Sequence, residues 1–151
     1  MAKTLIVAGF GPGISTSVAR NFGSQGYSVA LLSRTAAKLE AGVKDLEAQG
    51  IKAAAYPTDL TDAKAVAASI AKASAELGPV GALFWNPYGQ PVSSLEGEPE
   101  IFTANFLATV TGLVAAVQAA EADLEQTGGA VLVTGGGLSL ENDGSTGVAV
   151  S

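Results

Sequence analysis

The sequence contains neither cysteine nor histidine, and these two absences exclude whole classes of site. Without cysteine there can be no disulfides, no zinc–thiolate centres and no thiol catalysis. Without histidine there can be no Ser-His-Asp triad and no imidazole ligand for a metal. We therefore expect no metal site in this chain.

Charge is also scarce, and its balance is acidic. Charged residues make up 15% of the 151 residues, and 14 Asp and Glu against 8 Lys and Arg give a formal net charge of -6. An acidic surface repels phosphate backbones, so we expect no binding of nucleic acid. No apolar run approaches the roughly 20 residues that span a membrane, and Met1-Ala2-Lys3-Thr4 has no features of a signal peptide. The expectation is a soluble, cytoplasmic protein with no membrane partner.

What the chain has in abundance is apolar residues, at 48%, which suits a sheet covered on both faces. Short apolar runs at 4–10, 27–33, 51–57, 80–86 and 130–134 predict strands. Segments with helical periodicity at 13–25, 35–49, 61–77 and 101–126 alternate with them. The alternation predicts one domain over residues 1–151. Its expected fold is α/β of the Rossmann type, a doubly wound parallel sheet with strand order 3-2-1-4-5 and helices on both faces.

Several helix features are expected in more detail. Thr61 is a plausible N-cap of the third helix. Glu121, Asp123 and Glu125 are interpreted as a solvated helix face, with a partner site as the less favoured alternative. Two apolar stripes are expected: Ile14, Val18 and Phe22 on the first helix, and Phe102, Phe106, Val110, Leu113 and Val117 on the long one, where they face either the sheet or a partner.

The first strand-to-helix turn is rich in glycine and predicts a nucleotide site. Gly9, Gly11 and Gly13 lie between the first strand and the first helix, with Ile14 where a plain G-x-G-x-x-G would have its last glycine. A phosphate needs N–H groups at a helix N-terminus and a backbone without Cβ atoms in the way. Ser15 can offer a hydroxyl to the phosphate. The alternative is a tight turn without a ligand.

The same turn resembles that of the short-chain dehydrogenase/reductase family, T-G-x-x-x-G-x-G. Gly9 and Gly13 fall in place, while Ala8 replaces the threonine and Ser15 the last glycine. The resemblance continues in order along the chain. It implies an oxidoreductase that reduces carbonyls or oxidises alcohols of a small-molecule substrate by hydride transfer to or from a nicotinamide cofactor.

The end of the second predicted strand bears on the choice of cofactor. An acid usually holds a free ribose 2′-hydroxyl there, but no acid occurs between Tyr27 and Leu39, and Ser33-Arg34 occupies the strand end. A guanidinium matches a 2′-phosphate well. In the family this arrangement implies NADP, with NAD less favoured; the alternative is that Arg34 is a solvated charge.

Further positions match the family one by one. Asp59 and Leu60 resemble its acid-plus-apolar pair that contacts adenine, although Asp59 could also cap the next helix. Of the family's Asn-Asn-Ala-Gly only Asn86 matches, and the adjacent Trp85 either lines the cofactor or fills core. Asn105 matches the helix asparagine that helps place the catalytic lysine through water; otherwise it is an ordinary polar helix residue.

The family's reacting side chains are missing from this chain. The catalytic serine should follow the fifth strand, where Gly135-Gly136-Gly137 stands, and Thr134 or Ser139 could replace it only from a displaced position. No tyrosine follows Tyr88 and no lysine follows Lys72. We expect a chain that is truncated and, given the glycines, divergent. We assign Thr134 and Gly135 to the cofactor site.

Three functions compete on this basis. The favoured one is an NADP-dependent oxidoreductase represented by its cofactor-binding portion. The second is a catalytically silent dinucleotide-binding module that acts as a redox sensor or binds a partner. The third, a methyltransferase that uses S-adenosylmethionine, is disfavoured because such enzymes usually have an acid where Arg34 stands. The family resemblance also implies a homo-oligomer formed through the long helix.

Overall fold

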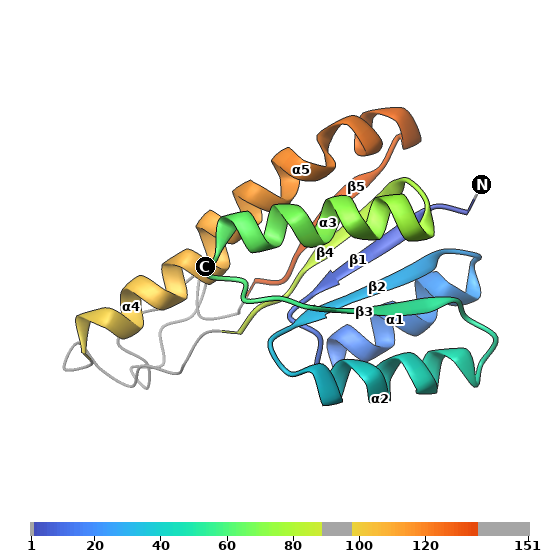
Figure 1. Cartoon of the computed structure of the whole chain (residues 1–151), viewed down its shortest axis with the longest axis horizontal. Helices are drawn as coiled ribbons and strands as arrows, with labels where there is room; N and C mark the ends of the chain where they lie inside the picture. Colours follow the sequence, from blue (N-terminus) through green and yellow to red (C-terminus); the bar gives the residue numbers. More distant parts are fainter. Residues whose placement is uncertain (1, 89–97, 136–151) are drawn as a thin grey trace.

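A computed structural model describes residues 2–88 and 98–135 of the chain and confirms the predicted fold. Its sheet has five parallel strands in the order β3-β2-β1-β4-β5 (Figure 1). The strands are β1 (Thr4–Ala8), β2 (Ser28–Ser33), β3 (Ala53–Pro57), β4 (Val80–Trp85) and β5 (Ala130–Val133). The helices are α1 (Ile14–Ser24), α2 (Ala36–Glu47), α3 (Ala63–Leu77), α4 (Pro99–Phe106) and α5 (Gly112–Thr127), with a π-helical turn η1 (Leu107–Thr111) between the last two.

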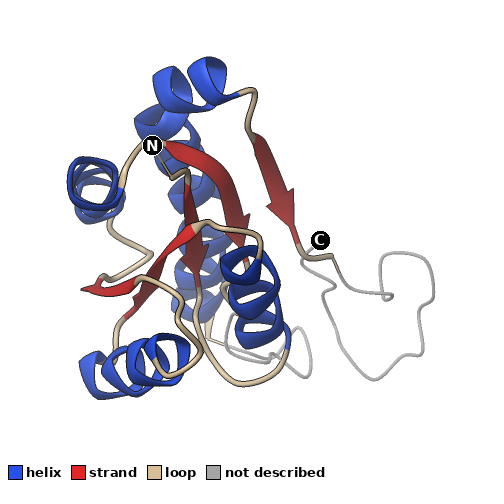
Figure 2. Cartoon of the chain, turned by 90° about the vertical axis from the view of Figure 1, so that its right-hand side faces the viewer, coloured by secondary structure: helices blue, strands red, loops and turns tan. Residues whose placement is uncertain are grey.

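The helices cover both faces of the sheet, as Figures 1 and 2 show. Alternate residues of each central strand point to opposite faces. On β1, Leu5 and Val7 join the core under α1 and α2, whereas Ile6 and Ala8 join the core under α3 and α5. All four are fully buried. A strand buried on both faces has to be apolar throughout, which is why β1 reads as one continuous apolar run.

Element ends differ from the predictions by one or two residues, and one difference has a clear cause. The N-cap of α3 is Asp62, whose carboxylate accepts hydrogen bonds from the backbone N–H groups of Lys64 and Ala65. Thr61 was therefore the wrong cap, and Asp59 does not cap this helix either. The side chain of Asp59 instead accepts hydrogen bonds from the backbone N–H and the hydroxyl of Thr61, two residues later.

The long C-terminal helix is continuous in direction but not uniform in its turns. The π turn η1 interrupts it, and its wider turn changes the face presented by the residues that follow. Leu113 and Val117 consequently pack against the core, while Phe106 and Val110 are 57% and 38% exposed. The predicted single apolar stripe was wrong. The exposed side of this helix instead carries Phe106, Val110 and Val114.

This helix is also the one, within the described ranges, that is long and apolar enough to cross a membrane by length and composition. It runs over 29 residues from Pro99 to Thr127, with a mean hydropathy of 1.6 in its most apolar window. It was not expected from the sequence, because threonine, asparagine and glutamine interrupt its apolar residues. In the structure α5 packs against α3 and β4 (Figure 1), but only 17% of that apolar window is buried.

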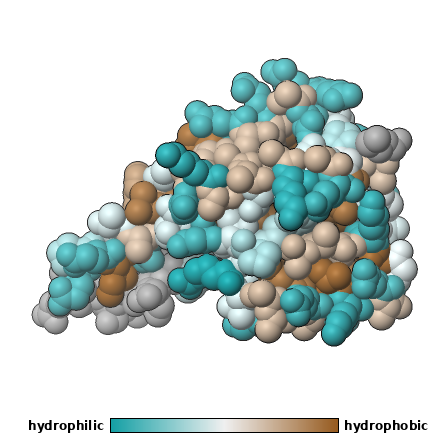
Figure 3. Space-filling model, in the orientation of Figure 1, coloured by the Kyte–Doolittle hydropathy of each residue, from teal (hydrophilic) through white to brown (hydrophobic). Residues whose placement is uncertain are grey.

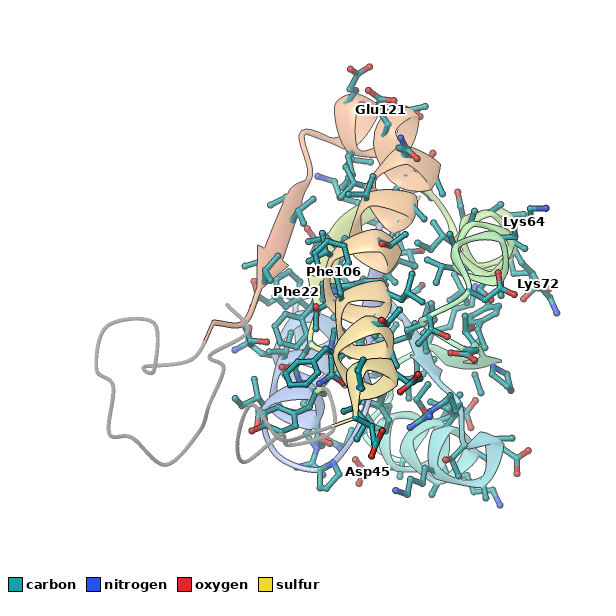
Figure 4. All side chains as sticks on the ribbon, turned by 90° about the vertical axis from the view of Figure 1, so that its left-hand side faces the viewer. Phe22, Asp45, Lys64, Lys72, Phe106 and Glu121 are labelled. Carbon is teal, nitrogen blue, oxygen red and sulfur yellow. The ribbon has the colours of Figure 1, made fainter. Side chains whose placement is uncertain are left out.

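Asp123 fastens the far end of the helical layer to the sheet. Its carboxylate accepts a hydrogen bond from the Ser74 hydroxyl on α3 and another, at 2.9 Å, from the backbone N–H of Val80 at the start of β4. The prediction that Asp123 belongs to a solvated face was therefore wrong. The neighbouring Glu121 is exposed and lies at the outer end of α5, pointing away from the domain (Figure 4).

We expect Asp123→Ala to lower the free energy of unfolding by about 2–3 kcal/mol, because two donors lose a charged acceptor in a partly buried place. Urea unfolding followed by circular dichroism measures it. Glu121→Ala is the matched control, with the same charge change on the same helix, and should alter stability by less than about 0.5 kcal/mol. Equal effects of the two variants would contradict the role assigned to Asp123.

Candidate functional site

The site is built where β1 and β4 end side by side. After Ala8 the chain turns sharply, and the N–H groups of Gly9 and Phe10 both donate to the carbonyl of Leu32 at 3.0 and 3.1 Å. Gly9 has φ +78°, and a Cβ there would lie 2.4 Å from the backbone oxygen of Asn86. Only glycine fits this turn, for both its backbone angle and the close approach of the neighbouring chain.

The turn leads to an open helix N-terminus. The N-cap of α1 is Gly13, which has φ +93° and offers no side chain to cap the first N–H groups of the helix. A Cβ placed at Gly11 or Gly13 would meet no atom of the described residues within 4 Å, so these residues leave the space beside both glycines free. Uncapped N–H groups facing open space at the positive end of a helix are suited to an anion such as a phosphate.

A chain of hydrogen bonds joins this turn to the ends of β4 and β5. The amide nitrogen of Asn86 donates to the hydroxyl of Ser15 at 2.8 Å, and that hydroxyl donates to the carbonyl of Gly9 at 3.1 Å. On the other side, the hydroxyl of Thr134 donates to the amide oxygen of Asn86. The structure therefore brings together Gly9, Ser15, Asn86 and Thr134, four of the residues singled out from the sequence.

In this arrangement the hydroxyl of Ser15 forms its hydrogen bonds within the protein, to Gly9 and Asn86. Its side chain is 1% exposed, and its single hydroxyl proton is directed at Gly9. The expectation that it offers that hydroxyl to a phosphate remains a prediction. Ile14, which was expected on the buried stripe of α1, is instead 59% exposed beside the open turn, while Val18 and Phe22 pack inward. An exposed apolar side chain at that place can cover an apolar part of a ligand.

A second group of residues lies at the ends of β2 and β3. Arg34 is exposed after β2, and Asp59 follows β3, the strand that pairs with β2. The backbone and side-chain hydrogen bonds from Thr61 are the main causes of the lowered pKa of Asp59, and the positive charge of Arg34 lowers it further. Beside them the hydroxyl of Ser33 is buried and, within the described ranges, has no hydrogen-bond partner. Within the described ranges, an exposed cation and a buried hydroxyl without a hydrogen-bond partner therefore lie at one strand end, where they can bind a polar ligand.

The remaining predicted residues are placed as follows. Leu60 is 7% exposed and belongs to the core beneath α3 and α5. Asn105 is 8% exposed on α4, two residues before the start of the π turn. No atom of the described residues lies within 4 Å of the position that a Cβ of Gly135 would take. Gly136, Gly137 and Ser139 lie outside the described residues.

Two residues near the turn were missed from the sequence. The hydroxyl of Thr16 donates to the carbonyl of Gly11 at 2.9 Å and so braces the open turn from within α1. Lys38 lies on a groove of about 400 Å³ shared with Gly11 and Thr16. The sequence does contain a signal for Lys38, because it is a second cation four residues after Arg34 and could likewise bind a phosphate. The groove is lined by Phe10, Gly11, Pro12, Thr16, Arg20, Lys38, Ala41, Gly42 and Asp45.

No group of three acidic side chains that could hold a metal ion occurs in the part of the chain that the structure describes. The site offers backbone N–H groups, amides, hydroxyls and the cations Arg34 and Lys38. Such a set binds phosphates and ribose hydroxyls.

Comparison with known proteins agrees with that geometry. The family model described as short chain dehydrogenase matches residues 3–146, nearly the whole chain. The chain belongs to the short-chain dehydrogenase family. The family consists of oxidoreductases with a nicotinamide cofactor, so the crevice at the ends of β1 and β4 lies where this family binds NAD or NADP.

Curated relatives match a little more than half of the chain. The 2,3-dihydro-2,3-dihydroxybenzoate dehydrogenase of Bacillus subtilis (strain 168) is 36% identical over 81 residues, which are 54% of this chain and 31% of the relative. The gluconate 5-dehydrogenase of Gluconobacter oxydans is 32% identical over 91 residues, 60% of this chain and 36% of the relative.

Solved structures share the fold. A 7α-hydroxysteroid dehydrogenase complexed with NADH and 7-oxo glycochenodeoxycholic acid superposes with a TM-score of 0.86 at 23% identity. An alcohol dehydrogenase from the archaeon Thermococcus sibiricus complexed with 5-hydroxy-NADP has a TM-score of 0.84 at 26% identity. The matches cover 93% and 92% of this chain, but 56% and 60% of those structures. The chain thus spans little more than half the length of these relatives.

The turn geometry predicts different outcomes for two neighbouring glycines. We expect Gly9→Ala to cost about 2–4 kcal/mol of stability, because it combines backbone strain with overpacking against Asn86. Gly11→Ala should leave stability within about 0.5 kcal/mol, since its Cβ enters free space. Thermal unfolding of the two variants beside the wild type measures both. A Gly9→Ala variant as stable as Gly11→Ala would contradict the close approach described here.

Proposed function

We propose that this chain is the cofactor-binding portion of an NADP-dependent oxidoreductase that interconverts carbonyls and alcohols of a small-molecule substrate by hydride transfer. The observation that carries the proposal is the pairing of an open, uncapped glycine turn with Arg34 at the end of β2, where no acid stands. Several solved members of the family that superpose on this chain contain NADP or NADPH, and another contains NADH.

The residues present fit a dinucleotide. The N–H groups at the start of α1, reached past Gly11 and Gly13, would hold the diphosphate. Arg34 would pair with the 2′-phosphate, and the orphaned hydroxyl of Ser33 would gain a partner on the ribose or its phosphate. The carboxylate of Asp59, whose pKa the hydrogen bonds from Thr61 hold below its usual range, would accept from the adenine amine, with Leu60 against the ring. The bound cofactor supplies or accepts the hydride.

The protein's own contribution is to position these groups before the cofactor arrives. Asn86, held between Ser15 and Thr134, fixes the wall of the crevice, and Ile14 and Gly135 border the space beside it. Asn105 would help to place the catalytic lysine through water, as the family resemblance implies. The protein acts in the cytoplasm, without a nucleic-acid or membrane partner.

A second function is favoured by one observation, the absence of the family's reacting groups. No tyrosine follows Tyr88 and no lysine follows Lys72 in the 151 residues, and glycines stand where the serine is expected. The alternative is a dinucleotide-binding module without catalysis, acting as a redox sensor or binding a partner. The cofactor binding proposed above is common to both functions. Oxidation of NADPH by this chain in the presence of carbonyl compounds would exclude the silent alternative.

We expect NADPH to bind more tightly than NADH, and Arg34→Asp to weaken NADPH by roughly 10- to 100-fold through loss of a charge-assisted contact to the 2′-phosphate. Calorimetric titration with each cofactor measures the preference. NADH binding should weaken far less, because NADH carries no 2′-phosphate.

The matched control is Lys52→Asp, which makes the same charge change just before β3, at the opposite end of the strand from Asp59. It should leave both affinities within about twofold. Equal affinity of the wild type for NADPH and NADH would refute the assignment of Arg34, and no binding of either cofactor would refute the nucleotide site itself.

We also propose that the chain forms a homo-oligomer through the long helix, with a second copy of the same helix as its partner. Residues 101–120 contain no charged side chain, and Phe106 and Val114 on the exposed side are 57% and 51% exposed. Figure 3 shows apolar and hydrophilic patches side by side on the face that carries α3, so exposed apolar surface is not confined to this helix. A stripe of large apolar residues on an uncharged stretch of helix is typical of an interface between subunits.

Val114→Asp should shift the chain toward the monomer in sedimentation velocity, because a charge would be buried without a partner in the interface. Ala119→Asp is the control; it adds the same charge on the same helix, away from the stripe, at another exposed position. A wild type that sediments as a monomer at all concentrations, or two variants that behave alike, would rule out this interface.

A further inference from the structure

Trp85, the single tryptophan of the chain, joins the cofactor crevice to the long helix. It is the last residue of β4, directly before Asn86, and its side chain is 1% exposed. Its indole N–H donates to the backbone carbonyl of Ala108 at 3.1 Å. Of the two roles expected for Trp85, core was the favoured one over a wall of the site, and the structure places it in the core with one directed polar contact.

That contact falls inside the π turn. In a continuous α-helix the N–H of Gly112 would donate to the carbonyl of Ala108, four residues earlier. Here the N–H of Gly112 donates to the carbonyl of Leu107 instead. The carbonyl of Ala108 is thus not the acceptor of the Gly112 N–H, and the indole N–H of Trp85 donates to it from outside the helix. An N–H from outside the helix satisfies a backbone acceptor that the π turn releases.

The fit of the ring against the helix is close. A Cβ at Gly112 would lie 2.8 Å from Cζ2 of Trp85 and 2.5 Å from the backbone oxygen of Leu60. The missing side chain of Gly112 therefore lets the helix approach both the indole and the segment that follows β3. With the hydrogen bond at one end of the turn and this contact at the other, the turn has little freedom to move along the helix.

Asn105 stands immediately before this turn. Its side chain is buried. Its backbone carbonyl accepts a hydrogen bond, at 2.8 Å, from the hydroxyl of Thr109, a residue of the π turn. Removing one residue's worth of π turn would rotate α4 by about 100° relative to α5, because one residue turns an α-helix by that angle. The π turn therefore sets which way the side chain of Asn105 points relative to the sheet.

We propose that Trp85 is a positioning residue, which holds the π turn through the carbonyl of Ala108 and thereby fixes the orientation of Asn105 toward the crevice. The functional meaning of that orientation rests on the proposed function, in which Asn105 helps to place the catalytic lysine. The role of Trp85 itself is a property of this chain and is testable without a cofactor.

The test is NMR of the whole chain with Trp85→Phe, which keeps a ring and removes the N–H. We expect the side-chain amide signal of Asn105 to move, and the amides of residues 108–113 to exchange with solvent roughly 3- to 10-fold faster. Amides of β1 and β2 should keep their wild-type rates. A variant that is merely less stable would instead exchange faster throughout.

Two further samples keep the test decisive. Phe84→Leu removes a ring from the adjacent residue of β4, which packs in the opposite core, and should not move the Asn105 signal. Because Trp85 is the only tryptophan, it can be replaced by its benzothiophene analogue, which keeps the shape without the N–H and should reproduce Trp85→Phe. An Asn105 signal that stays in place in both, or that Phe84→Leu moves equally, would overturn the proposal. Failure of NADPH to bind would affect only the proposed function.

Discussion

The close approach of two strand ends, β1 at Gly9 and β4 at Asn86, is the constraint on which the rest of the site depends. Parallel neighbours in a sheet are held about 4.8 Å apart, and here the turn after β1 must also pass over the backbone that leaves β4. A side chain at Gly9 would force the two apart. Because they meet, the amide of Asn86 can reach Ser15, and the start of α1 faces the crevice. Without this contact there would be a Rossmann-type sheet but no formed nucleotide site.

The fold was predictable because its signals are local and repeated. Buried parallel strands have to be apolar, and glycines or capping residues separate them from helices, so strand order and layers followed from the alternation alone. Ends were less certain: Asp59, Thr61 and Asp62 all suit a helix start, and only the backbone path decides that Asp62 caps α3. The roles of Asp123 and Trp85 could not be predicted, because their partners lie 43 and 23 residues away in the sequence.

The residues of the candidate site were predicted, but the hydrogen bonds between them were not. Gly9, Gly13, Arg34 and Asp59 were identified from spacing and resemblance, and the structure places them at the carboxyl ends of β1, β2 and β3. The structure adds two hydrogen bonds: the Ser15 hydroxyl donates to the carbonyl of Gly9, and the Thr134 hydroxyl donates to the amide oxygen of Asn86. Both depend on side-chain torsion angles, which a sequence pattern does not specify. The long helix shows the same limit, since a π turn leaves no mark in the periodicity of Phe106, Val110 and Leu113, yet divides them between two faces.

The chain of hydrogen bonds from Thr134 through Asn86 and Ser15 to Gly9 has a thermodynamic consequence. It crosses three separate segments, so the wall of the crevice is ordered when the sheet folds rather than when a ligand arrives. A ligand that binds to a wall already in place loses less free energy to ordering of the protein, and more of its contact energy appears as affinity. The hydrogen bonds also couple the stability of the three segments. A substitution at Thr134 therefore weakens the support of the glycine turn on the far side of β4, although the two residues are not in contact.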